Sequence, residues 1–446
     1  MSEPMENATP RSWFAGVMDA RLSGDVQKIL LLFLFFFFVI AAFWTLKPLR
    51  TSSVVKAFGV DYYPLIKQGV VLFIPFVVMF YSMMTSMLSR RHLVQFFTAI
   101  FIVFNVVFWC LFQWTPAGWV KVAFFFYVDT YITVMVALFW TYLNDVYKPD
   151  EAKRVYGVIG AGGLTGGIVG ASISGWASEL LGNNIVLVAT VLLVPIAVII
   201  RLLEESAGKD AQPVIAASGK GDRSPGKVFF EGATTVLKSR YLLSVVAIVG
   251  LYEIISTIID YQFNASASAA YETRDALAGF QGKVFFIAQI FALGIQLFIT
   301  SWVHRKFGVL TGLLFLPLAL MTGSVMFLIA PLLSVITLVI ASEAALAYSI
   351  NQASKEILYV PLDAVSKYKG KAFIDMFGLR AAKTVGAIIL LVYILVLRDY
   401  GFGVGFLVGV CIVALVGWLG AVWYVGNAFV ERASAPTPLS GVAENS

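Results

Sequence analysis

The sequence has few residues that bind metals or form disulfides: its 446 positions include only 2 cysteines and 2 histidines. Cys110 and Cys411 lie far apart in apolar stretches, and His92 and His304 lie in short basic segments. This spacing matches no zinc or iron–sulfur motif and gives no disulfide framework. An enzyme would also need a nucleophile beside a base, which the isolated histidines do not supply. We therefore expect no metal site, no cofactor and no catalytic activity.

Charged residues are also scarce, at 13% of the chain against 59% hydrophobic residues. Apolar runs this long and this numerous exclude an ordinary soluble domain and indicate an integral membrane protein. The net charge is +6, and no basic arm interleaved with aromatic residues is present. The composition therefore gives no support to nucleic-acid binding, and the expected surrounding is a lipid bilayer.

The apolar residues fall into about twelve stretches of roughly 20 residues, the length with which an α-helix crosses about 30 Å of hydrocarbon. Most of the 32 Lys and Arg residues lie before the first stretch, after every second stretch, or after the last. By the positive-inside rule, these segments and both termini are cytoplasmic. The predicted spans are 27–48, 62–87, 93–114, 119–143, 157–179, 185–203, 242–263, 283–303, 309–329, 332–353, 372–397 and 402–428.

One long polar segment, rich in Gly, Ser, Ala and Pro, divides these spans into two halves. The halves resemble each other, since "SMLSRRH" matches "TSWVHRKFG" and "YKPDEAKRVYG" matches "YVPLDAVSKYKG". The predicted fold class is an all-α membrane protein of twelve helices in two six-helix repeats, like the major facilitator superfamily. The predicted parts are an N-terminal tail at 1–26, a six-helix bundle at 27–203, a cytoplasmic linker at 204–241, a second six-helix bundle at 242–428 and a C-terminal tail at 429–446.

Several predicted spans contain ionisable residues, as the stretch "FGLRAAKTVGAIILLV" at 377–392 illustrates. Such a side chain at the bilayer centre costs about 2.5–3.5 kcal/mol, so it normally faces a partner or a wet cavity. The residues are Lys47, Asp129, Glu253, Glu343, Arg380 and Lys383. In a major facilitator arrangement, the spans that hold the first four line the central cavity.

The cations among them occur in pairs three residues apart, a spacing that places both members on one helix face. Lys47 pairs in this way with Arg50, and Arg380 with Lys383. Clustered cations that face a cavity suit an anionic substrate, in particular a phosphorylated one. The alternative is that they form structural ion pairs with acidic residues of neighbouring spans. On the seventh span, Asp260 lies on the stripe of Glu253, where it couples transport or is simply solvated.

A glycine-rich stretch, "GVIGAGGLTGGIVGAS", opens the fifth span. Gly162, Gly166 and Gly170 recur every four residues and therefore lie on one face of the helix. Small residues at this spacing let a second membrane helix approach closely. We predict helix packing at this face.

Three segments carry longer and more specific patterns. They are "WTLKPLRTSSVVKAFGVDYYPLIK", "FWTYLNDVYKPDEAKRVYGVIGAGG" and "SKEILYVPLDAVSKYKGKAFIDMFGLRAAKTVGA". They resemble the ATP/ADP translocase family, the nucleotide transporters of plastids and intracellular bacteria. The resemblance implies a twelve-helix carrier that exchanges ATP for ADP, or imports nucleotides with protons. It also implies functional roles for residues at matching positions: Lys47, Glu151, Glu253, Lys355, Lys369, Lys371 and Lys383.

The function that we predict is secondary active transport of nucleotides by alternating access, most simply as ATP/ADP exchange. The predicted phosphate-binding residues are Lys47, Arg50, Arg380 and Lys383. Asn144 and Tyr252 would contact base or ribose, and Glu253 would couple protons or switch ion pairs. The set with a predicted coupling or gating role is Asp129, Glu151, Asp260, Glu343, Lys355, Lys369 and Lys371.

The family pattern is not matched everywhere, since Pro48 follows Lys47 and residues 254–259 contain no cation. A carrier of another organic anion or phosphorylated metabolite, with or without proton coupling, is therefore the alternative. A further alternative is a membrane protein that binds its ligand without transporting it. The inside-positive pattern and the N-terminal composition favour a bacterial inner membrane, and we expect a monomer.

Overall fold

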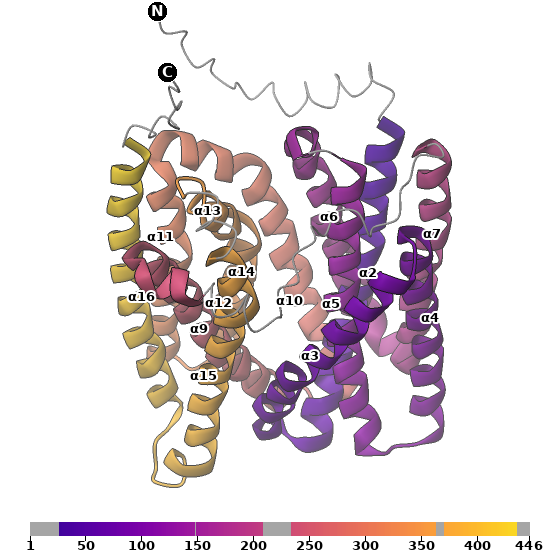
Figure 1. Cartoon of the computed structure of the whole chain (residues 1–446). Coiled ribbons are helices and arrows are strands. Elements are labelled where there is room, and N and C mark those ends of the chain that lie inside the picture. The colour runs from indigo at the N-terminus through magenta and orange to yellow at the C-terminus, as the bar shows by residue number, and fades with distance from the viewer. Residues whose placement is uncertain (1–25, 148, 208–232, 363–369, 435–446) are drawn as a thin grey trace, which may run out of the picture. The chain divides into compact units, whose positions relative to one another are not determined.

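The computed structural model describes residues 26–147, 149–207, 233–362 and 370–434, drawn as coloured ribbons in Figure 1. Within these residues the chain forms helices and no strand. Among the described residues, ten helical stretches are long and apolar enough to cross a membrane, which confirms the predicted all-α membrane class. Two of the ten, Tyr156–Leu203 and Arg274–Ile329, each contain two helices in succession.

The contacts between residues divide the chain into two compact units. The first unit comprises Met1–Gly221 with Tyr261–Leu293, and the second comprises Asp222–Asp260 with Gly294–Ser446. The helices of the first unit are α2 (Val26–Phe58), η1 (Val60–Tyr62), α3 (Tyr63–Met87), α4 (Arg90–Trp114), α5 (Gly118–Val146), α6 (Pro149–Leu181), η2 (Gly182–Asn184), α7 (Ile185–Ala207) and α10 (Arg274–Gly294).

Helix α9 (Arg240–Ala270) begins in the second unit and ends in the first. A further helical segment covers 233–238. The remaining elements of the second unit are η4 (Ile295–Ile299), α11 (Thr300–Ile329), α12 (Leu333–Leu346), η5 (Ala347–Asn351), α13 (Gln352–Ile357), α14 (Lys371–Phe373), η7 (Ile374–Gly378), α15 (Leu379–Val392), η8 (Tyr393–Leu397) and α16 (Val404–Ser434).

Helix α2 is longer than the sequence predicts. The expected end at residue 48 is wrong, because the helix continues through Pro48 to Phe58. Proline normally ends a helix, but membrane helices tolerate it where neighbouring groups satisfy the backbone. Lys47 therefore lies well inside a continuous helix.

Close packing of α2 against α6 organises the first unit. A Cβ atom at Gly162, Gly166 or Gly170 would collide with the backbone carbonyls of α2, so these positions require glycine. This confirms the predicted packing face. Beside this contact, the Phe36 ring of α2 stacks on Phe139 of α5 with 4.2 Å between ring centroids.

Several predicted single spans contain local breaks in the α-helix. Gly308 has a φ of 82° and interrupts α11, which matches the predicted boundary between residues 303 and 309. The segments η5, η7 and η8 are π-helical turns inside the predicted spans 332–353 and 372–397. Such turns occur often at functional sites. The two spans that contain them carry Glu343, Arg380 and Lys383.

Candidate functional site

In the first unit, Lys47 of α2 contacts two aromatic rings. Its Nζ atom lies 4.0 Å from the ring centroid of Trp44 and 4.3 Å from that of Phe285 on α10. Both rings are buried. A cation over an aromatic face gains electrostatic attraction, more so when the site is desolvated. The rings thus hold the ammonium group inside the membrane-spanning part of the unit.

Arg50 lies one turn further along α2 and pairs with Asp129 of α5. Its guanidinium also lies 4.4 Å from the ring centroid of Phe125. The Arg50 side chain is 8% exposed and that of Asp129 22%, so the pair is largely sheltered. The Phe43 ring lies near both Lys47 and Arg50, which agrees with their predicted common face. We call Lys47, Arg50, Asp129 and their aromatic neighbours Trp44, Phe125 and Phe285 the first-unit cluster.

In the second unit, the buried carboxylate of Glu343 on α12 accepts two hydrogen bonds from α9. Tyr252 donates from its hydroxyl at 2.7 Å, and Ser256 donates at 3.0 Å. These bonds satisfy a buried polar group that would otherwise be costly. The Tyr252 ring also packs on Trp418 of α16, with 5.7 Å between centroids. Tyr252 is therefore held in place by two elements.

Glu253, the next residue of α9, pairs with Lys383 of α15 at 3.6 Å. The Lys383 side chain is 44% exposed and that of Glu253 only 13%, so the lysine is the less covered member of the pair. Arg380 lies one turn before Lys383 and has no carboxylate within 4 Å in the part of the chain that the structure describes. We call Tyr252, Glu253, Ser256, Glu343, Arg380 and Lys383 the second-unit cluster.

Further charged groups gather where α13 and α14 meet. Lys371 forms a 2.5 Å ion pair with Glu356, and its Nζ atom lies 5.4 Å from the Tyr359 ring centroid. Burial raises the pKa of the Tyr359 phenol, so this ring stays neutral.

Lys355 connects this group to the second-unit cluster. Its Nζ atom lies 5.7 Å from the Tyr252 ring centroid, and its charge interacts with that of Glu253. Residues predicted to bind substrate and residues predicted to gate are therefore neighbours in this unit.

Other predicted residues lie apart from these clusters or outside the described part. The amide oxygen of Asn144 accepts a 2.5 Å hydrogen bond from Tyr156 in an exposed position near the end of α5. Asp260 lies on α9 at the point where the second unit ends and the first unit resumes. Lys369 and the side chain of Glu151 fall outside the described residues. Within the described residues, no group of three or more His, Cys, Asp or Glu side chains is arranged to hold a metal ion.

Sequence reasoning missed several functional-site neighbours. Ser256 escaped notice because a serine in a membrane helix costs little and gives no strong signal, although it lies one turn after Tyr252. Trp44 and Phe285 look like any other aromatic residue in an apolar stretch. Lys56 was also missed; it donates a 2.7 Å hydrogen bond to the carbonyl of Ser268 on α9.

Solved structures with a similar fold are transporters. A POT family peptide transporter aligns with a TM-score of 0.60 and 11% identity, over 93% of this chain and 98% of its own. The nucleoside transporter NupG aligns with a TM-score of 0.58 and 12% identity, over 92% and 99%. At this identity the comparison establishes only that the chain shares the fold of these transporters.

Sequence relatives are more specific. ADP,ATP carrier protein 1 of Chlamydia trachomatis is 25% identical, over 92% of this chain and 90% of its own. The plastidic ATP/ADP-transporter of Solanum tuberosum is 25% identical, over 73% and 58%. ADP,ATP carrier protein 1 of Rickettsia prowazekii is 23% identical, over 64% and 63%. The model of the TLC ATP/ADP transporter family matches residues 117–429, so this chain, with its charged clusters inside membrane-spanning helices, belongs to that family of transporters and is not an enzyme.

Proposed function

We propose that the protein exchanges ATP for ADP across a bacterial inner membrane by alternating access. Its family and the names of its relatives support nucleotides as the substrate class. The charged clusters support an anionic substrate, because cations that persist in membrane helices need an anionic partner. In this proposal the chain is a monomer of twelve helices in two six-helix halves at 27–203 and 242–428, joined by a cytoplasmic linker, with cytoplasmic tails at 1–26 and 429–446.

The single observation that carries the proposal is the arrangement of Arg380 and Lys383 on α15. Lys383 is held by Glu253 at 3.6 Å while nearly half of its side chain stays exposed. Arg380 has no carboxylate partner among the described residues. A phosphate group supplies acceptors that match the planar donors of arginine and the ammonium of lysine. A nucleotide phosphate would bind Arg380 and draw Lys383 away from Glu253.

The remaining residues take secondary roles in the proposal. Lys47 and Arg50 would bind phosphate as well, and Asn144 and Tyr252 would contact base or ribose. Glu253, released from Lys383, would switch ion pairs or take up a proton. Transport would be coupled or gated through Asp129, Glu151, Asp260, Glu343, Lys355, Lys369 and Lys371.

The test is uptake of labelled ATP into proteoliposomes that contain the purified protein. Vesicles preloaded with ADP are compared with unloaded vesicles and with protein-free vesicles. Exchange requires uptake that depends on internal ADP. No uptake under either loading, with protein shown to be folded, would overturn nucleotide exchange.

The residue assignment is tested with Arg380→Ala and Lys383→Ala. Each removes a charge-assisted hydrogen bond, worth about 1.5–3 kcal/mol, so uptake at low ATP should fall roughly 10- to 100-fold. Lys306→Ala, which removes an exposed cation near the start of α11, is the matched control and should transport normally. Normal uptake by both α15 variants would exclude a phosphate role for that face.

A carrier of another organic anion is the alternative, favoured by Pro48 after Lys47 and by the absence of cations at 254–259. Unlabelled ATP, ADP, other nucleotides and phosphorylated sugars are added as competitors to separate the two. Competition by a phosphorylated sugar but by no nucleotide would establish the alternative.

A further inference from the structure

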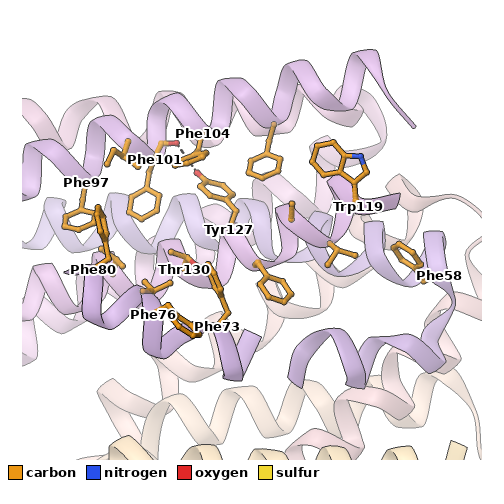
Figure 2. A pocket seen from close by; sticks show the side chains of 17 residues that line it. Phe58, Phe73, Phe76, Phe80, Phe97, Phe101, Phe104, Trp119, Tyr127 and Thr130 are labelled. Atoms are coloured by element: carbon orange, nitrogen blue, oxygen red, sulfur yellow. Dashed lines mark hydrogen bonds between the residues drawn. The ribbon is translucent and has the colours of Figure 1, made fainter. Parts of the chain in front are cut away.

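A long aromatic groove lies in the first unit, and no residue of the first-unit cluster lines it. It has a cavity volume of about 910 Å³ and is formed by α3, α4, α5 and the end of α2. Figure 2 shows Phe58 and Trp119 at one end of the groove and Phe80 and Phe97 at the other. Between them lie rings from three helices, among them Phe73, Phe76, Phe101, Phe104 and Tyr127.

Contacts at the two ends of α3 create this groove. Near the start of α3, Gly69 approaches the Phe126 ring of α5 so closely that a Cβ atom there would lie 2.8 Å from it. Near the end, Phe80 packs on Phe97 of α4 with 6.2 Å between ring centroids. Between these contacts α3 contains Pro75, which removes a backbone hydrogen bond and favours a bend. The helix is thus attached at both ends and leaves a space along its middle.

The lining is suited to an apolar ligand. Tyr127 and Thr130 are the polar side chains of the lining, and the Tyr127 hydroxyl already donates to Asn105 Oδ1 at 2.7 Å. Some of the rings are also open to the surroundings, with Phe76 64% and Trp119 61% exposed. Aromatic side chains exposed on membrane-spanning helices face hydrocarbon, so the occupant must be part of the membrane or dissolved in it.

The dimensions indicate which part of the membrane fits. Along α5 the lining runs from Trp119, the second residue of the helix, to Val134, past its midpoint. At 1.5 Å per residue this distance is about 22 Å, the depth from one membrane interface to just beyond the bilayer centre. Tryptophan is enriched at the headgroup level of membranes, which places the Trp119 end of the groove at the interface. The groove therefore follows one leaflet from headgroup to chain end.

We propose that this groove is a specific binding site for one acyl chain of a phospholipid in the leaflet on the Trp119 side. The headgroup lies beside Trp119 and Phe58, and the end of the chain reaches Phe80, Phe97 and Val134. Bound lipid fills the space between α3 and the pair α4 and α5. The lipid contacts α5 at Thr130, the residue next to Asp129. It thereby stabilises the helix whose Asp129 pairs with Arg50 of α2.

The site is tested with the full-length protein in vesicles that contain trace phosphatidylglycerol with a diazirine on one acyl chain. One probe carries the diazirine at the end of the chain and a second carries it near the glycerol. After illumination, adducts are mapped by mass spectrometry of peptides. The chain-end probe should label peptides around Phe97 and Val134, and the second probe those around Trp119.

Ala123→Trp places a large ring inside the groove and should lower labelling of both regions about tenfold or more. Val103→Trp adds the same ring to an exposed position of α4 outside the lining, and should leave labelling unchanged. Labelling spread evenly over exposed residues such as Leu338, or unaffected by Ala123→Trp, would mean ordinary bilayer contact and would overturn the proposal.

Discussion

At the scale of single residues, the Arg50–Asp129 pair has the clearest energetic consequence. Arg50→Ala removes the partner of a sheltered carboxylate in a medium that solvates charge poorly, and Asp129→Asn leaves the guanidinium without its counter-ion. Each variant should melt at a lower temperature than the parent protein in detergent. The double variant should lose less stability than the two single variants lose together, with a coupling energy of about 0.5–3 kcal/mol.

Thermal melting of the four proteins side by side measures this coupling. Lys121→Ala is the control, because this exposed lysine only donates a 3.1 Å hydrogen bond to the carbonyl of Pro116. Strictly additive losses would contradict the idea that the two side chains stabilise each other.

The charged residues could be predicted from the sequence, but their partners could not. Lys47, Asp129, Glu253 and Glu343 are conspicuous because an ionisable group in an apolar stretch is costly. Which acid meets which base depends on helix rotation and depth, and hydropathy does not determine either. The Lys383–Glu253 pair therefore emerges only in three dimensions.

At the scale of helices, the glycine face of α6 makes a sharp prediction. Gly166→Ala should destabilise the protein by roughly 1–3 kcal/mol, because the new methyl group collides with the Phe37 backbone of α2. Gly160→Ala is its matched control on the same helix, since a Cβ atom there meets nothing within 4 Å. Alanine favours a helix over glycine by about 0.8–1.0 kcal/mol, so this control should be neutral or stabilising.

Both variants are compared by their melting temperatures and by the fraction of protein that remains monodisperse after extraction. Equal behaviour of Gly166→Ala and Gly160→Ala would show that α2 and α6 are not packed as closely as the structure indicates.

Helix ends were harder to predict than helix faces. The four-residue glycine spacing indicated the packing face correctly, because it depends only on helix geometry. The predicted span ended at residue 48, whereas α2 continues to Phe58, because hydropathy follows the apolar stretch and does not detect a helix that continues beyond it. The aromatic groove gave no signal either, since phenylalanine has the same hydropathy against lipid as in a groove.

At the scale of the whole molecule, hydropathy and charge bias predict both the class and the orientation in the membrane. The class follows because only helices satisfy their own backbone in hydrocarbon. The two long helical stretches, Tyr156–Leu203 and Arg274–Ile329, decide the orientation. Each must cross twice for both termini and the linker to lie in the cytoplasm.

This orientation can be tested by cysteine labelling, because the chain has only Cys110 and Cys411 to replace with alanine. Single cysteines are then placed at Thr115, Leu180, Ser218 and Lys306. An impermeant maleimide added to intact cells should label the first two, which lie at predicted outer ends. Ser218→Cys and Lys306→Cys should react only after the membrane is permeabilised. Labelling of Lys306→Cys in intact cells would show that Arg274–Ile329 does not cross twice, and the arrangement in two six-helix halves would have to be abandoned.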